Sequence, residues 1–276
     1  MAKADYVVTL DQRPYRRHQG HRRTGMVRAV RSELKKVLSL SAPIAAVILT
    51  VTLTITLSGF LTFTTKHAFE QGHPEQMAGL EPASAFLAIL YYEQVGSLFI
   101  GSWLVIEEQG HGNLRTTYLA MPQRQRVYVA KAIVVALVTT LTGLLSVFGS
   151  YAVRTAFVGE VLIGDASIPN ARVLWGYVLY GVLISLVTYG LSSLLRNGIG
   201  GLCTMLCAIL IASPLLLSKT QLARFLADQA GAQMYMSTLP TGADLGPMCG
   251  FVVMLAWVML LNIAGCISQR VASVRG

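Results

Sequence analysis

The sequence predicts an all-α integral membrane protein with six transmembrane helices and an amphipathic helix at the membrane surface before the first of them. Two observations predict this class. Of the 276 residues, 54% are hydrophobic and only 13% are charged, whereas about a quarter of the residues are charged in soluble domains. The apolar residues also form continuous runs and do not alternate at period two, which favours helices over barrel strands.

The apolar runs define the spans. Five stretches contain no Asp, Glu, Lys or Arg, and a sixth is interrupted only by Glu93. Each stretch exceeds the roughly 20 residues that a helix needs to cross a hydrocarbon core about 30 Å thick. The predicted spans are residues 38–64, 83–106, 128–153, 173–195, 198–218 and 246–268.

The distribution of Lys and Arg predicts the orientation. With a cytoplasmic N-terminus, the inside segments hold ten basic residues before Val37, four from Glu107 to Lys131, and three more at Arg196, Arg270 and Arg275, which makes 17 of the 22. The positive-inside rule therefore predicts a multi-pass plasma-membrane protein with both termini in the cytoplasm. The net charge of +9 follows from this topology, and no basic soluble domain suggests a nucleic-acid partner.

The chain before the first span divides into two parts. Residues 1–25 are polar and basic and predict a disordered cytoplasmic tail, whereas residues 26–276 form the membrane domain. From Met26, apolar residues recur at helical spacing, with the opposite side filled by basic residues, Arg28, Arg31, Lys35 and Lys36. This pattern predicts an interfacial helix on membrane lipid before the chain turns inward at Pro43. A simple extension of the first span fits the same pattern.

The second span carries Glu93 and Gln94 in its interior. An ionisable group within a span is a candidate for a substrate pathway, because burying it in lipid is costly. The other interpretation is structural, with Glu93 protonated or paired with a polar group of another helix. Both interpretations remain open on the sequence alone.

Two connections have patterns of their own. The segment 107–127 is polar, contains glycines and basic residues, and falls on the cytoplasmic side. The outer loop 219–247 contains Leu222, Phe225, Leu226 and Met234, which predict an amphipathic helix resting at the outer interface. That helix would either shape an external gate or cap the bundle against lipid.

The sequence predicts no catalytic residues and no enzymatic activity. It has no G-x-x-x-x-G-K-[ST] phosphate loop, no H-E-x-x-H and no G-x-S-x-G. No metal site is predicted either: His18 and His21 lie in the basic tail, and Cys203 and Cys207 share one face of an apolar span, where packing explains them. We therefore expect no cofactor bound by this chain.

The order of elements and several local motifs resemble the ABC-2 type permease family. The segment after the second span reads Glu107, Gly112, a short helix over 114–119, then Ala-Met-Pro at 120–122, and Arg124, Arg126 and Lys131 before the third span. The opening MVRAVRSELKKV is similar to the first helix of the family, and the ending LGPMCGFVVMLAWVMLLNIAGCISQR is similar to its last span. The resemblance covers about nine-tenths of the chain.

The resemblance implies an ABC-2 (type V exporter-like) permease architecture. In that case two permease chains, identical or paralogous, would pair, and each would dock a separate ABC ATPase subunit that binds ATP and Mg. The cargo would be hydrophobic or amphipathic, such as a drug, an antimicrobial peptide or a lipid. The resemblance implies that one set of residues couples to the ATPase: Gly112, Asn113, Leu114, Arg115, Tyr118, Pro122, Arg124 and Arg126.

Two other classes are compatible with six spans. An ion-coupled secondary transporter predicts internal repeats and more charge within the membrane, and the two three-span halves show no repeat that aligns. An intramembrane enzyme or an assembly scaffold would need a reactive pair within the spans, where Glu93 stands alone.

Overall fold

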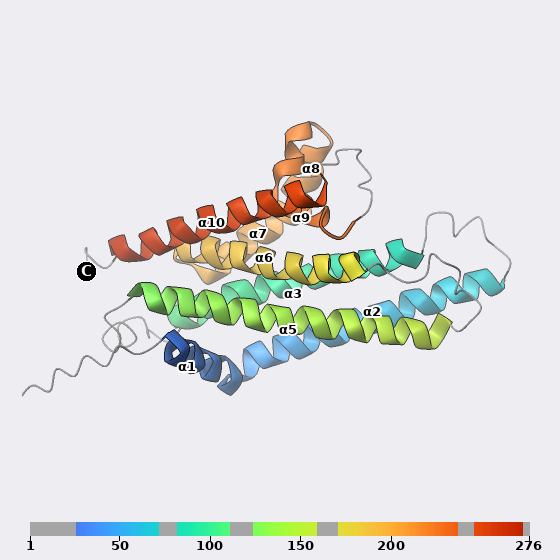
Figure 1. Cartoon of the computed structure of the whole chain (residues 1–276), viewed down its shortest axis with the longest axis horizontal. Helices are drawn as coiled ribbons and strands as arrows, with labels where there is room; N and C mark the ends of the chain where they lie inside the picture. The colour runs from blue at the N-terminus through green and yellow to red at the C-terminus, as the bar shows by residue number, and fades with distance from the viewer. Residues whose placement is uncertain (1–25, 72–81, 111–123, 159–170, 237–245, 273–276) are drawn as a thin grey trace, which may run out of the picture.

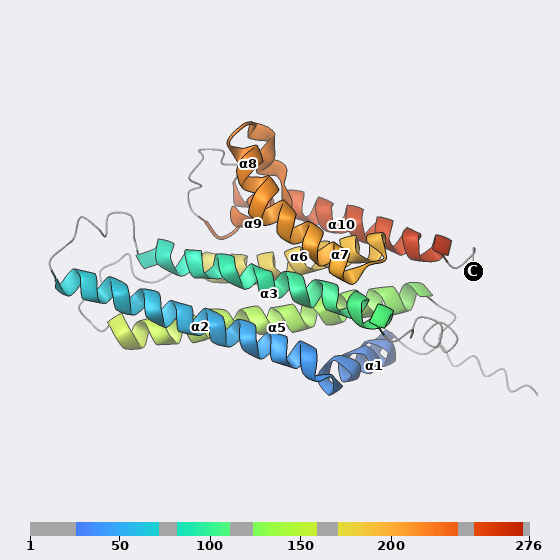
Figure 2. The same cartoon turned by 180° about the vertical axis from the view of Figure 1, so that it is seen from behind.

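The computed structural model describes residues 26–71, 82–110, 124–158, 171–236 and 246–272 (Figure 1). Within these ranges the chain is helical and contains no β-strand. The long helices run side by side along the long axis of the bundle (Figures 1 and 2). Their bounds are α1 Met26–Ser39, α2 Ser41–Glu70, α3 Pro82–Gly110, α5 Arg124–Val158, α6 Ala171–Leu195, α7 Gly198–Cys207 and α10 Pro247–Ala272.

Five segments among the described residues are long and apolar enough to cross a membrane. They are Ser41–Thr64, Gln125–Val153, Ala171–Leu195, Gly198–Leu217 and Pro247–Gln269. The helical, multi-pass class predicted from the sequence is therefore confirmed. The remaining predicted span, 83–106, falls within the 29-residue helix α3, but the side chains of its outer part lie outside the described residues, so the count of six stays a prediction.

Helix α6 lies at the centre of the bundle and packs against α3, α5, α7, α9 and α10. It approaches α10 closely where Gly190 faces Gly265. A Cβ atom at Gly265 would lie 2.8 Å from the carbonyl oxygen of Gly190, and one at Gly190 would meet the backbone of Leu261 at 2.8 Å. Small residues allow such backbone contact between helices in lipid, and any larger side chain here would push the two helices apart.

The amphipathic helix predicted before the first span forms a separate element. Helix α1 ends at Ser39, and α2 begins at Ser41 in a different direction (Figures 1 and 2). Pro43 occupies the first turn of α2, where its missing N–H costs no intrahelical hydrogen bond. The alternative that residues 26–39 extend the first span is therefore wrong.

The outer segment after the fifth span differs from the single amphipathic helix that was predicted. The fifth span runs through α7, the π-helical turn η3 (Ala208–Ala212) and α8 (Ser213–Leu217). The chain then forms a 3-10 turn, η4 (Gln221–Phe225), and a six-residue helix, α9 (Ala227–Ala232). The extended backbone of Leu226 separates the two.

Small side chains explain why α9 packs into the bundle and does not rest on lipid. The residues Ala230, Gly231 and Ala232 are buried, and Gly231 lies directly against the ring of Tyr180 in α6. The indole N–H of Trp257 in α10 donates to the carbonyl oxygen of Phe225 at 2.9 Å and holds η4 in place. Residues 237–245 of this outer segment lie outside the described residues.

Asp228 is buried where α9 meets the start of α8. The Gln229 side-chain amide donates to its carboxylate at 2.9 Å and to the Ser213 hydroxyl, also at 2.9 Å. Burial nevertheless raises the pKa of Asp228 above 3.8, and the hydrogen bonds from Ser213 and Gln229 only partly oppose that rise. The folded chain therefore binds this proton more tightly than the unfolded chain does.

This shift predicts a pH dependence of stability with a definite sign. For an acid whose folded pKa is raised, the contribution to stability is complete below the unfolded pKa and is lost as the pH rises through the folded pKa. Asp228→Asn removes the ionisation and keeps a carbonyl oxygen for Gln229. We expect the melting temperature of Asp228→Asn, relative to the natural chain, to rise from pH 4 to pH 8 in detergent. A constant difference over that range would contradict the shift.

Candidate functional site

Glu93 lies in α3 where α3, α5 and α6 pack together, and its side chain is only 2% exposed. The Tyr177 hydroxyl of α6 hydrogen-bonds its carboxylate. The Ser146 hydroxyl of α5 faces the same carboxylate without full hydrogen-bond geometry. The structure thus places the one carboxylate predicted within a span inside the bundle, away from lipid.

Gln94 is buried next to Glu93 and joins the same cluster. It accepts a hydrogen bond from the Tyr180 hydroxyl of α6 at 2.5 Å. Three tyrosine rings pack together beside this pair: Tyr235 lies 5.4 Å from both Tyr177 and Tyr180, and the last two are 6.4 Å apart, measured between ring centroids. Tyr235 follows α9, so the outer segment contributes to the site, which the sequence did not indicate.

Several polar atoms in this region are buried and have no hydrogen-bond partner within the part of the chain that the structure describes. They are Glu93 Oε2, Gln94 Nε2, Ser146 Oγ and Ser150 Oγ. In hydrocarbon, where no bulk water is available, an unpaired polar group costs several kcal/mol. These atoms can therefore form hydrogen bonds with water or with a bound group. The Glu93 carboxylate favours a bound group that donates a hydrogen bond and carries positive charge.

Hydroxyl groups continue from this cluster along α5 and α6. Thr142, Ser146 and Ser150 recur every fourth residue and are all buried, so they form one polar stripe on α5. The Thr139 hydroxyl donates to the Ser185 hydroxyl at 3.1 Å, which joins α5 to α6. The spacing of these residues is visible in the sequence, but hydroxyl groups at this spacing do not by themselves indicate a site.

A second polar region lies at the end of the bundle that contains α1, the start of α5 and the C-terminal end of α10 (Figure 1, left). The turn between α6 and α7 belongs to it. Arg196 there has a left-handed backbone with φ 51°, and its guanidinium donates to the Ser268 carbonyl oxygen of α10 at 2.6 Å. Gln109 of α3 reaches the same turn through the backbone of Arg196 and Gly198.

The residues predicted to couple to an ATPase fall mostly outside the described residues. Gly112, Asn113, Leu114, Arg115, Tyr118 and Pro122 are in this group. Arg124 begins α5, and Arg126 is exposed in its first turn. The connection from α3 to α5 therefore starts and ends at the polar end of the bundle.

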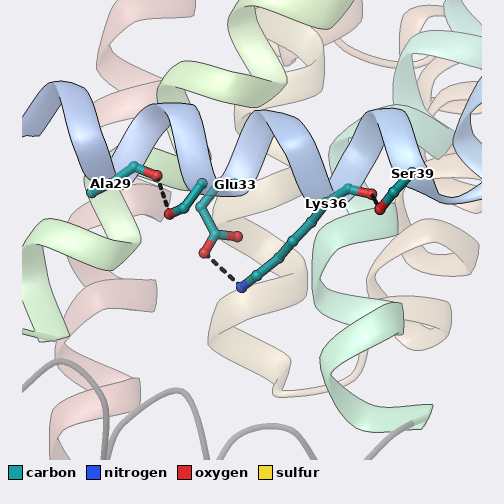
Figure 3. Close-up of polar contacts among 5 residues, drawn as sticks. Ala29, Glu33, Lys36 and Ser39 are labelled. Atoms are coloured by element: carbon teal, nitrogen blue, oxygen red, sulfur yellow. Dashed lines mark hydrogen bonds and ion pairs between the residues drawn. The ribbon is translucent and has the colours of Figure 1, made fainter.

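Helix α1 packs on α5 at this end through one face. Ala29, Glu33 and Val37 are buried, whereas the predicted interfacial residues Arg28, Arg31, Lys35 and Lys36 are exposed. Lys36 pairs with Glu33 at 2.8 Å (Figure 3). This arrangement agrees with the amphipathic pattern. The pattern did not indicate that the acidic residue Glu33 would be buried on the packed face.

Lys131 of α5 adds a buried basic group near Glu33, which itself pairs with Lys36. Lys131 is 5% exposed, and its charged neighbours are Glu33, Lys36 and Glu107. These groups come from three helices, α1, α3 and α5, and Glu107 closes α3 just before the connection to α5. The charges therefore join α1 to both ends of that connection.

Removing one charge from this cluster should lower the stability of the protein more than removing one positive and one negative charge together. Lys131→Met leaves only Lys36 to balance the two negative charges of Glu33 and Glu107, and removing one partner from a buried group of charges costs up to about 3–5 kcal/mol. Lys131→Met with Glu33→Gln restores the balance, so we expect the double variant to unfold at higher denaturant than Lys131→Met alone. Arg31→Met, on the exposed face, is the matched control and should change little. Additive losses in the double variant would contradict this coupling.

The inner cluster, which comprises Glu93, Gln94, Ser146, Tyr177 and Tyr180, can bind a hydrogen-bond donor or a cation. The charge cluster of Glu33, Lys36, Lys131 and Glu107 at the end of the bundle can hold three helices in one arrangement. Among the residues that the structure describes, no three His, Cys, Asp or Glu side chains gather in a way that could hold a metal ion. No protein-family model matches the chain, and no curated protein is similar to it. A function must therefore be inferred from the geometry of these two regions together with the motifs of the sequence.

Proposed function

We propose that this chain is the permease subunit of an ABC exporter and moves a hydrophobic or amphipathic cargo across the plasma membrane. A separate ATPase subunit supplies the energy, and a second permease chain, identical or paralogous, completes the transporter. The observation that carries the proposal is the polar end of the bundle. There the α3–α5 connection, which has the family-like motif, begins and ends beside an interfacial helix tied to it by Glu33, Lys131 and Glu107.

Helix α5 provides the mechanical link from that end to the inner cluster. It begins at Arg124, directly after the connection, and continues without a break for 35 residues. Ser146, which faces Glu93, lies on the same helix. A rigid helix transmits displacement along its length, so a push on the connection would move Ser146 relative to Glu93 of α3 and Tyr177 of α6.

The inner cluster supports a preference for cargo with a cationic group. Glu93 supplies the charge, and the surrounding tyrosines supply ring faces that attract cations. A lipid-like or peptide cargo with an amine would satisfy the unpaired Oε2 atom of Glu93. In this proposal both chain termini and the α3–α5 connection face the cytoplasm, as the distribution of basic residues predicts.

Charge reversal at the connection tests the proposal. The tagged chain is expressed in its natural host and purified in mild detergent, and the ATP turnover of the complex is measured. Arg124→Glu with Arg126→Glu should lower associated ATP turnover at least about tenfold, the factor for about 1.4 kcal/mol of lost contact energy. Arg172→Glu, exposed at the start of α6 at the other end, is the control and should retain turnover. Unchanged docking and turnover in the double variant would refute the coupling role.

One observation favours the second candidate, an ion-coupled secondary transporter. Glu93 is a buried carboxylate among hydroxyl groups, and such groups also bind the driving ion in secondary transporters. The purified chain in liposomes distinguishes the two functions. We expect no uptake of a cationic dye driven by a proton gradient when the ATPase is absent.

Glu93→Gln provides the second part of that test. In the complete transporter it should weaken transport of a cationic dye roughly tenfold, since a hydrogen bond to a charged group contributes about 1.5–3 kcal/mol, and it should leave ATPase association intact. Gradient-driven uptake by the chain alone, abolished by Glu93→Gln, would instead establish the secondary transporter.

A further inference from the structure

Tyr128 lies in the second turn of α5 and joins that helix to both α6 and α10. Its side chain is buried, and its hydroxyl donates to Asn262 Oδ1 of α10 at 3.0 Å. Its ring packs on the ring of Tyr189 in α6, with the centroids 5.0 Å apart. The Tyr189 hydroxyl donates in turn to the backbone carbonyl oxygen of Tyr128 at 3.2 Å. These three residues, Tyr128, Tyr189 and Asn262, are called the tyrosine junction below.

Helices α6 and α10 are already joined to each other at the level of the junction. The Asn262 side-chain amide donates to the carbonyl oxygen of Leu186 in α6 at 3.0 Å. The contact between Gly190 and Gly265 lies beside it, because a Cβ atom at Gly265 would lie 3.1 Å from the Tyr128 hydroxyl oxygen. The junction therefore holds α5 against a pair of helices that are in backbone contact.

A second acceptor lies next to the Tyr128 hydroxyl. The Ser193 hydroxyl of α6 faces it without full hydrogen-bond geometry and has no partner among the described residues. Tyr128 could therefore exchange its bond to Asn262 for one to Ser193. A small rotation of α5 at this point would not leave the phenol unpaired, so the junction can turn without coming apart.

Beyond the junction α5 is held less firmly to this pair of helices. Among the described residues it packs against α1, α2, α3 and α6 but barely touches α10. Farther along, the Thr139 hydroxyl donates to the Ser185 hydroxyl of α6. A single hydrogen bond between neutral hydroxyls of two helices in lipid is weak, so this bond can break when α5 tilts.

From these contacts we infer that the tyrosine junction is the pivot about which α5 tilts against the α6–α10 pair. The inference rests on the proposed function, in which an ATPase pushes on the α3–α5 connection. Tyr128 is separated from Arg124 by about 6 Å of helix and from Ser146 by about 27 Å, at about 1.5 Å per residue. A push at Arg124 would therefore move Ser146 in the opposite direction and about four to five times as far.

The junction residues would thus act as positioning residues for the inner cluster. They contact neither Glu93 nor a cargo, but they determine how far Ser146 moves relative to Glu93 and Tyr177. Without the pivot, a push on the connection would shift α5 along its neighbours as a whole, and the movement at Ser146 would be no larger than the movement at Arg124.

Distances between spin labels test the pivot. The natural cysteines, Cys203, Cys207, Cys249 and Cys266, are replaced by alanine. One label is attached to α10 through Ile263→Cys and the other to α5 through Val129→Cys or Phe148→Cys, at positions that are all exposed. The complex with its ATPase is measured in nanodiscs without nucleotide and after trapping with ATP and vanadate.

We expect trapping to change the Phe148–Ile263 distance several times more than the Val129–Ile263 distance, because Val129 is next to the pivot and Phe148 is far from it. Equal changes in the two distances would overturn the pivot. No change in either distance, in a complex that binds its ATPase, would refute the proposed function itself and the pivot with it.

Tyr128→Phe with Tyr189→Phe tests which groups form the pivot. The double variant keeps both rings and removes both hydroxyl donors, so ATPase association should persist while the Val129–Ile263 change on trapping rises towards the Phe148–Ile263 change. Asn262→Leu, which removes the acceptor on α10 and leaves both tyrosines in place, should act in the same direction and serves as an independent variant.

Tyr151→Phe, near the other end of α5, is the matched control and should keep the natural pattern of distances. Melting temperatures are measured for every variant, so that a loss of stability is separated from a change in movement. If the folded junction variants keep the natural pattern of distances, whatever their melting temperatures, the junction is only structural and the inference fails.

Discussion

Helix α6 determines where most of the other helices lie, because it carries both a close backbone contact and many of the buried polar groups. Gly190 permits backbone contact with α10, and Tyr177, Tyr180 and Ser185 reach the neighbouring helices α3 and α5. In a bilayer, no water is available to satisfy such groups, so each polar side chain must hydrogen-bond its own helix or face another one. This requirement orients α3 with Glu93 inward, and it brings the outer segment back over Tyr180.

The two polar regions differ in how completely their groups are paired. At the end of the bundle, Glu33, Lys36, Lys131 and Glu107 balance one another's charges across three helices. In the interior, Glu93 Oε2 and Gln94 Nε2 have no hydrogen-bond partner among the described residues. Paired charges hold a fixed arrangement, whereas unpaired groups provide capacity for a ligand. This division suits a protein that is moved at one end and binds its cargo inside.

The sequence was sufficient to predict the elements whose position depends on a single physical signal. Runs without charge longer than the membrane thickness predicted the five segments that are long and apolar enough to cross a membrane, and the spacing of Arg28, Arg31 and Lys35 predicted a helix with an exposed basic face. It was insufficient over Leu222–Met234, because an apolar face fits lipid or another helix equally well, and only the bulk of Tyr180 and the small size of Gly231 select the bundle. The hydroxyls of Ser146 and Ser150 were overlooked because such groups usually bond their own helix. The motif at 112–122 lies outside the described residues, so it remains a prediction.

The spans differ in length, and this has a consequence for the surrounding bilayer. At 1.5 Å per residue, the charge-free segment Ser41–Thr64 of α2 measures about 36 Å, whereas Gly198–Leu217, which forms the fifth span, measures about 30 Å. Lipid that contacts α2 must therefore thicken or the helix must tilt, while lipid beside the fifth span need not change. The protein presents a hydrophobic belt of uneven height to the membrane, so a change in bilayer thickness changes the preferred tilt of α2.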